Sequence, residues 1–344
     1  MNASTPDQLP DQLPDHRHLH DHLIAAYTQV GSVNRRAVES LTVVLAQLRA
    51  NGIACLLLKG ADLLSRLYGV WGLRPMVDAD LLVHAHDLPA IDAILTELGY
   101  QSQIDGNPAY YHADDSLMLD LVTEIWYTDD QDGIWQRAVP RNLGNLGHLG
   151  DLPVLRMGSD DLLIYLTAYT VLHRGHVSPT FSQDIALLTK KEPLNWDVIL
   201  AEASRCNLTI PLFHGLSYAI GQRAMAVPPD VLVRLAPTDA GERLLAFVLR
   251  RLVGEHPIAD IGHVLLLLTR PRGKKWRWLL KTVCPSPAFL QYRYGSDGQN
   301  RPARTRLLRL ADLFSQAVRL AGRILARLIR PVSSGQRHAP NNLV

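Results

Sequence analysis

Two aspartates separated by a single residue form the most suggestive chemical group in this sequence. Asp78 and Asp80 stand in the stretch VDADLLV, whose apolar residues favour a β-strand. Residues two apart on a strand point to the same face, so both carboxylates would lie on one side. Val77, Ala79 and Leu81 would then be buried on the other side. Crowded carboxylates repel each other unless a cation lies between them, and the hard ion Mg²⁺ suits oxygen ligands.

A third carboxylate, Asp120, stands on a second predicted strand with the sequence SLMLDLV, residues 116–122. An antiparallel neighbouring strand would bring Asp120 beside the first pair. Three carboxylates in this arrangement can hold two metal ions for in-line attack on a phosphoryl group. Because Asp-x-Asp pairs are also common on solvated strand faces, the surrounding residues must decide between the two interpretations.

The segment upstream of the aspartates supplies that context. The apolar run IACLLL, residues 53–58, indicates a buried strand, and a helix is predicted over residues 61–68. Lys59 and Gly60 lie at the turn between them. A glycine at this turn lets backbone N–H groups approach phosphate oxygens at a helix N-terminus, and Lys59 would add a positive charge beside a triphosphate.

Three further polar residues each have two interpretations. Arg74, four residues before Asp78, either contacts a phosphate or pairs with a nearby acid. His173 and Asp184 lie in segments with helical periodicity. They either line a substrate cleft or are core residues whose hydrogen bonds are satisfied by neighbours, and the second interpretation is favoured.

The pattern of apolar residues predicts an α+β protein, with an N-terminal mixed sheet flanked by helices and a mostly helical domain after it. In residues 21–150, helices are expected over 23–51, ending at Gly52, and over 88–98. A hairpin-like pair of strands is expected around 110–111 and 116–122. In residues 151–294, helices are expected at 159–173, 182–190, 195–206, 210–224, 229–235 and 240–253. The helical domain would complete the cleft and select the substrate.

The remaining segments are polar or repetitive. Residues 1–20, which include the repeat PDQL-PDQL, are expected to form a mobile tail, residues 295–303 a linker and residues 331–344 a disordered tail. Four alternating histidines follow the repeat, at His16, His18, His20 and His22. They could bind a metal in an extended segment, but a solvated cluster at the start of the first helix is favoured.

Residues 304–330 predict one basic amphipathic helix. Its arginines and other polar residues recur every three or four positions on one face, and its apolar residues fall on the other. We expect the apolar stripe to pack on the helical domain, which would bury Phe314, Val318 and Leu325. The basic face would remain as a weak contact surface. Peripheral contact with an anionic membrane is the second interpretation.

Composition limits the other classes of function. The net charge is +2 with a sequence pI near 8.4, which does not indicate a nucleic-acid partner. Cys55, Cys206 and Cys284 are far apart, so free thiols are expected rather than zinc ligands or disulfides. The N-terminal residues have neither a basic nor an apolar region, so no signal peptide is expected, and no apolar run is long enough to predict a spanning helix. A cytoplasmic protein is expected, with a peripheral position at the inner membrane surface left open.

The run LLLKGADLLSRLYGVWGLRPMVDADLLV resembles the uncharacterised nucleotidyltransferase family of the DNA polymerase β superfamily. In that family an apolar strand is followed by LKG, a helix ending in LY, an arginine and then D-x-D-L-L-V. The segments HDLPAIDAILTELGYQ, QDIALLTKKEPLNWDVILAEA and CPSPAFLQYRYG are also similar to family segments. The resemblance covers about residues 25–295.

The residues and the resemblance together lead to one main hypothesis. The enzyme would move a nucleotidyl group from an NTP, such as ATP, to a hydroxyl or phosphate of an acceptor and release pyrophosphate. The acceptor, a small molecule, peptide, saccharide or protein, stays open. The expected site consists of Asp78, Asp80 and Asp120, which are catalytic and hold two Mg²⁺ ions, and of Lys59, Gly60 and Arg74, which bind the nucleotide.

The sequence departs from the superfamily pattern at two places. Most members carry Gly-Ser after the first strand, where the serine binds phosphate, whereas this chain has Gly60-Ala61. Relatives often have a His-Trp pair after the third acid. Here the sequence continues to Glu124, which makes Glu124 a substitute candidate for Asp120. A degenerate, non-catalytic binding or regulatory module is therefore the alternative hypothesis.

Overall fold

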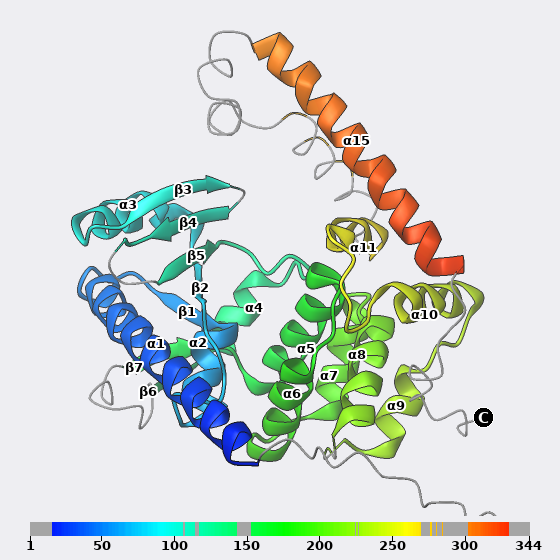
Figure 1. The fold of residues 1–344 in the computed structure, drawn as a ribbon, viewed down its shortest axis with the longest axis horizontal. Coiled ribbons are helices and arrows are strands. Elements are labelled where there is room, and N and C mark those ends of the chain that lie inside the picture. Colours follow the sequence, from blue (N-terminus) through cyan, green and yellow to red (C-terminus); the bar gives the residue numbers. More distant parts are fainter. Residues whose placement is uncertain are drawn as a thin grey trace, which may run out of the picture.

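The computed structural model describes residues 16–105, 107–113, 117–142, 153–223, 225, 227–269, 276, 280, 284 and 302–329. Within them a mixed β-sheet lies beside a group of helices (Figure 1), which confirms the predicted α+β class. Residues 1–15 of the tail expected over 1–20 lie outside the described residues, as do the tail at 331–344, most of the linker and the loop at 143–150. Residues 16–20 belong to a helix, so the expected tail was wrong there.

The sheet has the strand order β3-β4-β5-β2-β1-β7-β6. Its strands are β1 (Cys55–Leu58), β2 (Asp78–Val83), β3 (Gln101–Asp105), β4 (Asn107–Tyr111), β5 (Met118–Val122), β6 (Val139–Asn142) and β7 (Pro153–Arg156). β2 lies between β1, which is antiparallel to it, and β5, which is parallel to it. The strands expected at 53–58 and 116–122 are confirmed. β3, β6 and β7 were not predicted because they are short and carry polar residues or proline.

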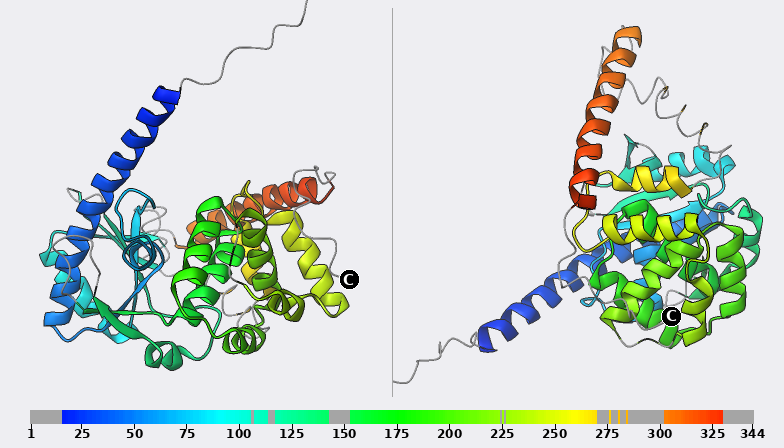
Figure 2. Two further views of the ribbon diagram at one scale, coloured as in Figure 1. Left: turned by 90° about the horizontal axis from the view of Figure 1, so that it is seen from below. Right: turned by 90° about the vertical axis from the view of Figure 1, so that its right-hand side faces the viewer.

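The helices of the N-terminal part are α1 (His16–Ala50), α2 (Lys59–Leu63), the π-helical turn η1 (Leu64–Tyr68), the 3₁₀ turn η2 (Ala85–Asp87), α3 (Leu88–Glu97) and α4 (Gln131–Gln136). Of these, α1 and α3 cover one face of the sheet, whereas Ile134 of α4 joins the core on the other face. Buried residues of α1 and α3 share a core with Leu57, Leu81 and Leu121 of the sheet. The start of α1 extends away from the body (Figure 2), and the segment from His16 to His22 is helical rather than extended.

α1 ends where its sequence predicts. Gly52 has a φ of 70°, a conformation that glycine adopts without strain, and the Ile53 N–H donates to the Leu48 carbonyl at 2.9 Å. In the helical part, the caps Ser178, Asn195 and Asp239 each accept a hydrogen bond from the backbone N–H three residues later.

The helical part follows the sheet in the chain. Its elements are α5 (Ser159–Ala168), the π-helical turn η4 (Tyr169–Arg174), α6 (Pro179–Lys191), α7 (Trp196–Arg205), α8 (Thr209–Gln222), α9 (Pro229–Leu235), α10 (Ala240–Leu252), α11 (Ile261–Thr269) and α15 (Pro302–Ile329). The six helices predicted within 151–294 are confirmed with small shifts at their ends. α11 was seen in the sequence only as a short apolar run. Leu56, Leu58 and Leu82 from the second sheet face share one core with these helices.

A buried network of charges also joins the two parts. Arg66 of η1 donates to both carboxylate oxygens of Glu192, just after α6, at 3.0 and 3.2 Å. It also lies 3.4 Å from Asp62, which faces Arg156 of β7. Burial by itself would raise the pKa of Glu192, but hydrogen bonds from Arg66 and Ser159 lower it to about 2.

We predict that Glu192→Gln destabilises the protein by about 2–3 kcal/mol at pH 7, because Arg66 would stay buried without its charged partner. The folded pKa of Glu192 lies below its ordinary value of 4.5. Its stabilisation is therefore complete above about pH 4.5 and is lost as the pH falls through about 2. Urea unfolding at several pH values measures this difference.

The exposed Glu97 on α3 offers a matched control, and Glu97→Gln should change the free energy of unfolding by less than about 0.5 kcal/mol. A Glu192→Gln deficit that stays constant between pH 7 and pH 2 would contradict the assigned electrostatic cause.

Candidate functional site

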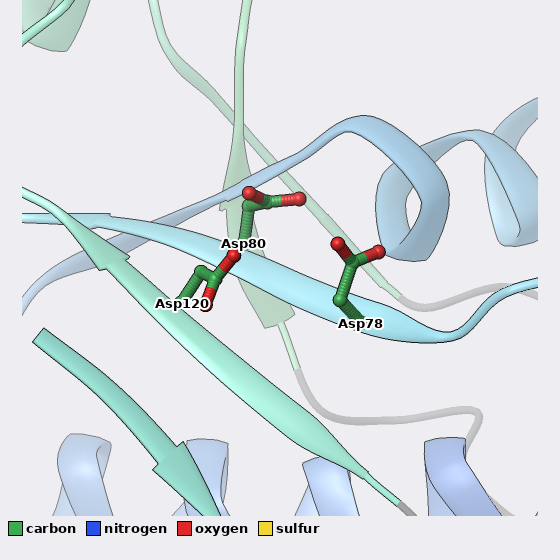
Figure 3. A group of neighbouring side chains, drawn as sticks. All are labelled: Asp78, Asp80 and Asp120. Atoms are coloured by element: carbon green, nitrogen blue, oxygen red, sulfur yellow. The ribbon is translucent and has the colours of Figure 1, made fainter. Parts of the chain in front are cut away.

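Three carboxylates converge on one face of the sheet. Asp78 and Asp80 come from β2 and Asp120 from β5, and the register pairs Asp80 directly with Asp120. One oxygen of each carboxylate lies within 4.8 Å of the others, and Figure 3 shows the three side chains together. The strands that bring them together are parallel, so the expectation of an antiparallel neighbour was wrong. A parallel partner serves equally well, because it also aligns residues across the ladder.

The alternation of β2 explains why the carboxylates share a face. Ala79 and Leu81 are fully buried against the α1–α3 side, as expected, while Asp78 and Asp80 point to the opposite side. Val77 does not belong to the buried set. It precedes the first residue of β2 and is exposed, because the chain is still in the loop that enters the strand.

Crowding and burial make Asp80 electrostatically unusual. Only 2% of its surface is exposed, and burial, with the charges of Asp78 and Asp120, raises its pKa to about 6 despite the opposing effect of Lys59. Burial and Asp78 also raise the pKa of Asp120. The Oδ2 atom of Asp80 is buried and has no hydrogen-bond partner within the described part of the chain. A cation at this place would satisfy that oxygen and relieve the repulsion.

The positive charge of Lys59 offsets part of the negative charge of the carboxylates. Lys59 follows β1, whose last residue pairs with Asp80, and its Nζ lies 2.5 Å from Asp80 Oδ1. The same ammonium lies 3.9 Å from the centroid of the Tyr169 ring, within the range of a cation–π contact. Burial would lower the pKa of Lys59, but Asp80 and Tyr169 raise it. Its φ of 48° is strained for a residue with a side chain.

Arg74 pairs with an acid, as one of its two interpretations stated. It donates to both oxygens of Asp184 on α6, at 2.9 and 3.0 Å, and the Tyr68 hydroxyl donates to the same carboxylate at 2.7 Å. Asp184 is thus a buried acid with satisfied hydrogen bonds. Gly60 lies below the guanidinium, since a Cβ there would come within 2.9 Å of Arg74 Nη1. The glycine therefore permits a close approach of Arg74.

Sequence reasoning missed the residue that fixes the loop before β2. Asn34 of α1 is buried and donates from Nδ2 to the carbonyls of Trp71 and Arg74, at 2.6 and 2.8 Å. Its Oδ1 accepts a hydrogen bond from the Met76 N–H at 3.1 Å. A lone polar residue among apolar helix positions was the available signal, but its partners lie about forty residues away in the chain.

An aromatic ladder on α5 and η4 was also missed, although it contains His173; this histidine is exposed, so its favoured interpretation as a core residue was wrong. Tyr165, Tyr169 and His173 are four residues apart, and their rings stack at 6.1 and 4.9 Å between centroids. The spacing of four could have indicated a shared helix face. Through Tyr169 the ladder meets Lys59 and so lies next to the carboxylates.

The two candidates for the third acid lie in different surroundings. Asp120 groups with Asp78 and Asp80, whereas Glu124 lies beyond the end of β5 and is exposed. Among the residues that the structure describes, these three form the one group of acids, histidines and cysteines with a geometry suited to a metal ion.

No curated protein matches the chain. Among solved structures, the antibiotic-resistance factor ANT(2'')-Ia shares 16% identity with a TM-score of 0.37, covering 49% of this chain and 92% of that one. The lincosamide antibiotic adenylyltransferase LnuA shares 15% identity with a TM-score of 0.32, covering 45% and 97%. An antigenic nucleotidyltransferase-like protein from Paracoccidioides brasiliensis shares 16% identity with a TM-score of 0.36, covering 59% and 92%.

The family comparison is more extensive. A sequence model of the family described as uncharacterised nucleotidyltransferase matches residues 3–220. The match includes β1, β2 and β5, which carry the carboxylates and Lys59, and continues through most of α8. Because it spans more than half of the chain, this protein belongs to that family and is a nucleotidyl-transfer enzyme.

Proposed function

We propose that this enzyme uses Mg²⁺ to transfer a nucleotidyl group from an NTP to a hydroxyl or phosphate oxygen of an acceptor. The observation that carries the proposal is the convergence of the carboxylates of Asp78, Asp80 and Asp120. Within this group the Oδ2 atom of Asp80 is buried and has no hydrogen-bond partner among the described residues. The donors are all carboxylate oxygens, a set that suits Mg²⁺ better than softer metals.

In this proposal Asp78 and Asp80 would hold both metal ions, and Asp120 would help to hold the ion that activates the acceptor. Bound Mg²⁺ would neutralise the triphosphate and stabilise the charge that develops during transfer. Asp120, whose pKa is raised, is suited to accept the proton of the acceptor hydroxyl. The acceptor oxygen then forms a bond to the α-phosphorus while the bond to the bridging oxygen breaks and pyrophosphate leaves.

We further propose that Lys59 binds the triphosphate. Its ammonium already lies beside Asp80, so a metal ion that takes over this carboxylate would free Lys59 for a phosphate oxygen. Gly60 contributes by allowing the backbone to lie close to Arg74. The bidentate pair with Asp184 favours a positioning role for Arg74 over direct phosphate contact.

The proposed domain layout assigns residues 21–150 to the nucleotidyltransferase domain and residues 151–294 to a helical domain that selects the acceptor. The role given to the helical part is supported by Tyr169, which belongs to it, stacks with Tyr165 and His173, and contacts Lys59. Incubating the enzyme with labelled NTPs and cell extract, and tracing the labelled product, would identify the nucleotide and the acceptor.

The alternative hypothesis of a non-catalytic module rested on Ala61, which offers no hydroxyl to a phosphate, and membership of a nucleotidyltransferase family does not favour it. Such a module would bind NTP and metal but release no pyrophosphate. Measuring NTP binding and labelled product formation on the same preparation distinguishes the two functions.

We predict that Asp78→Asn and Asp80→Asn each reduce nucleotidyl transfer by about a thousandfold or more, since a metal supplies several kcal/mol of transition-state stabilisation. Removing a charge from this crowded group lowers repulsion, so the melting temperature without metal should stay the same or rise. Glu124→Gln provides a matched control that should keep full activity. Wild-type rates in both aspartate variants would refute the assignment.

We also predict that metal affinity depends on pH in a defined direction. The pKa of Asp80 is raised to about 6, so protons compete with the metal below this value. Affinity for Mn²⁺, measured by calorimetry, should be constant above about pH 7. It should fall about tenfold per pH unit below about pH 6. An affinity that is flat down to pH 4 would contradict a role for Asp80 as a ligand.

Two conservative variants test the role of Arg74. Arg74→Lys removes the bidentate geometry and should destabilise the protein by about 1–3 kcal/mol, and Asp184→Asn should have a similar effect. If the role is positioning, both variants raise the KM for NTP to a similar extent. A rise in KM for Arg74→Lys alone, with unchanged stability, would instead show direct phosphate contact. Arg49→Lys, at an exposed position of α1, serves as the control.

A further inference from the structure

The last helix packs on the body only in part. Figures 1 and 2 show α15 extending away from the molecule, with its C-terminal end near α10. Leu320, Ile324 and Leu328, which are four residues apart, pack against the main apolar core. None of the described helices has the length and apolarity needed to cross a membrane, and this includes α15.

A second apolar stripe on α15 remains uncovered. Its residues are spaced by three, four or seven positions and so lie on one side of the helix, at Leu307, Leu310, Phe314, Val318, Leu325 and Ile329. Phe314 is 72% exposed, Val318 56% and Leu325 58%. The expectation that packing would bury these three residues was therefore wrong, because the helix contacts the body through a neighbouring face.

The charges of α15 are almost all of one sign. The helix carries six arginines, at positions 304, 306, 309, 319, 323 and 327, and a single acidic residue, Asp312. Arg319 and Arg323 are exposed and lie roughly opposite Phe314 on the helical wheel. The sequence between α11 and α15 adds to this composition. Residues 270–281 contain six lysines or arginines, two tryptophans and no acid, and Trp276 is exposed.

We propose that α15 lies flat on an anionic lipid surface, with its exposed apolar stripe in the interface and its arginines at the headgroups. A helix with bulky apolar residues along one side and arginines along the other has the composition of an interfacial helix. A second copy of this chain is a poorer occupant, because two helices with this excess of arginine would repel each other. This proposal is independent of the site chemistry proposed above.

The test uses the full-length protein and sedimentation with vesicles of phosphatidylcholine, with and without phosphatidylglycerol. We expect binding only to the anionic vesicles. Raising the ionic strength from about 0.1 M to about 1 M shortens the Debye length from about 10 Å to about 3 Å and should weaken binding. Phe314→Ser combined with Leu325→Ser should lower vesicle affinity by at least about tenfold, because two exposed apolar side chains leave the interface.

Matched controls separate these effects from unfolding. Val233 on α9 is 57% exposed, so Val233→Ser should leave vesicle binding and the melting temperature unchanged. Arg319→Glu with Arg323→Glu should weaken binding, whereas Arg35→Glu with Arg49→Glu on α1 should not. Circular dichroism should show an unchanged melting temperature in all these variants.

Three results would overturn the proposal. The first is that the wild-type protein binds neither type of vesicle. The second is that it binds neutral and anionic vesicles equally well. The third result has two parts: the wild-type protein is a dimer in light scattering and binds no vesicles, and Phe314→Ser with Leu325→Ser converts the dimer to a monomer. That result would assign the stripe to a second copy of this chain.

Discussion

The repulsion between three carboxylates on one face of a buried sheet is the constraint on which this site depends. Asp80 lies in the centre of the sheet, where water cannot screen its charge, and Asp78 and Asp120 lie beside it. Lys59 balances part of this charge from the end of β1, at the cost of a strained backbone. The proposed metal ions would complete the neutralisation.

The second requirement is a fixed relation between the sheet and the helices. The sheet face that carries the carboxylates continues into a core shared with α5, α6 and α8. Charged groups strengthen the same junction, because Arg66 joins Glu192 and Arg74 joins Asp184 across it. Removing one partner of such a buried pair is costly, because it leaves an uncompensated charge inside the protein. Across the same junction, the ammonium of Lys59 lies 3.9 Å from the centroid of the Tyr169 ring.

Long-range contacts also explain why α15 differs from the other helices. Helices α5 to α8 bury their apolar faces against one another and the sheet. α15 follows them in the chain, and it uses one narrow face for the body and leaves a second apolar face exposed. The packed helices and α15 share the same amphipathic pattern in their sequences. Only the number of neighbours around the helix distinguishes a packed helix from one with a free surface.

The sequence by itself determined the α+β class, the strands that carry Asp78, Asp80 and Asp120, and most helix ends. These follow from local apolar periodicity, caps such as Ser178 and glycines such as Gly52. Tertiary structure alone decided that β5 runs parallel to β2, that Arg74 pairs with Asp184, and that the stripe through Phe314 is exposed. Each depends on residues far apart in the chain, whose contacts local patterns do not encode.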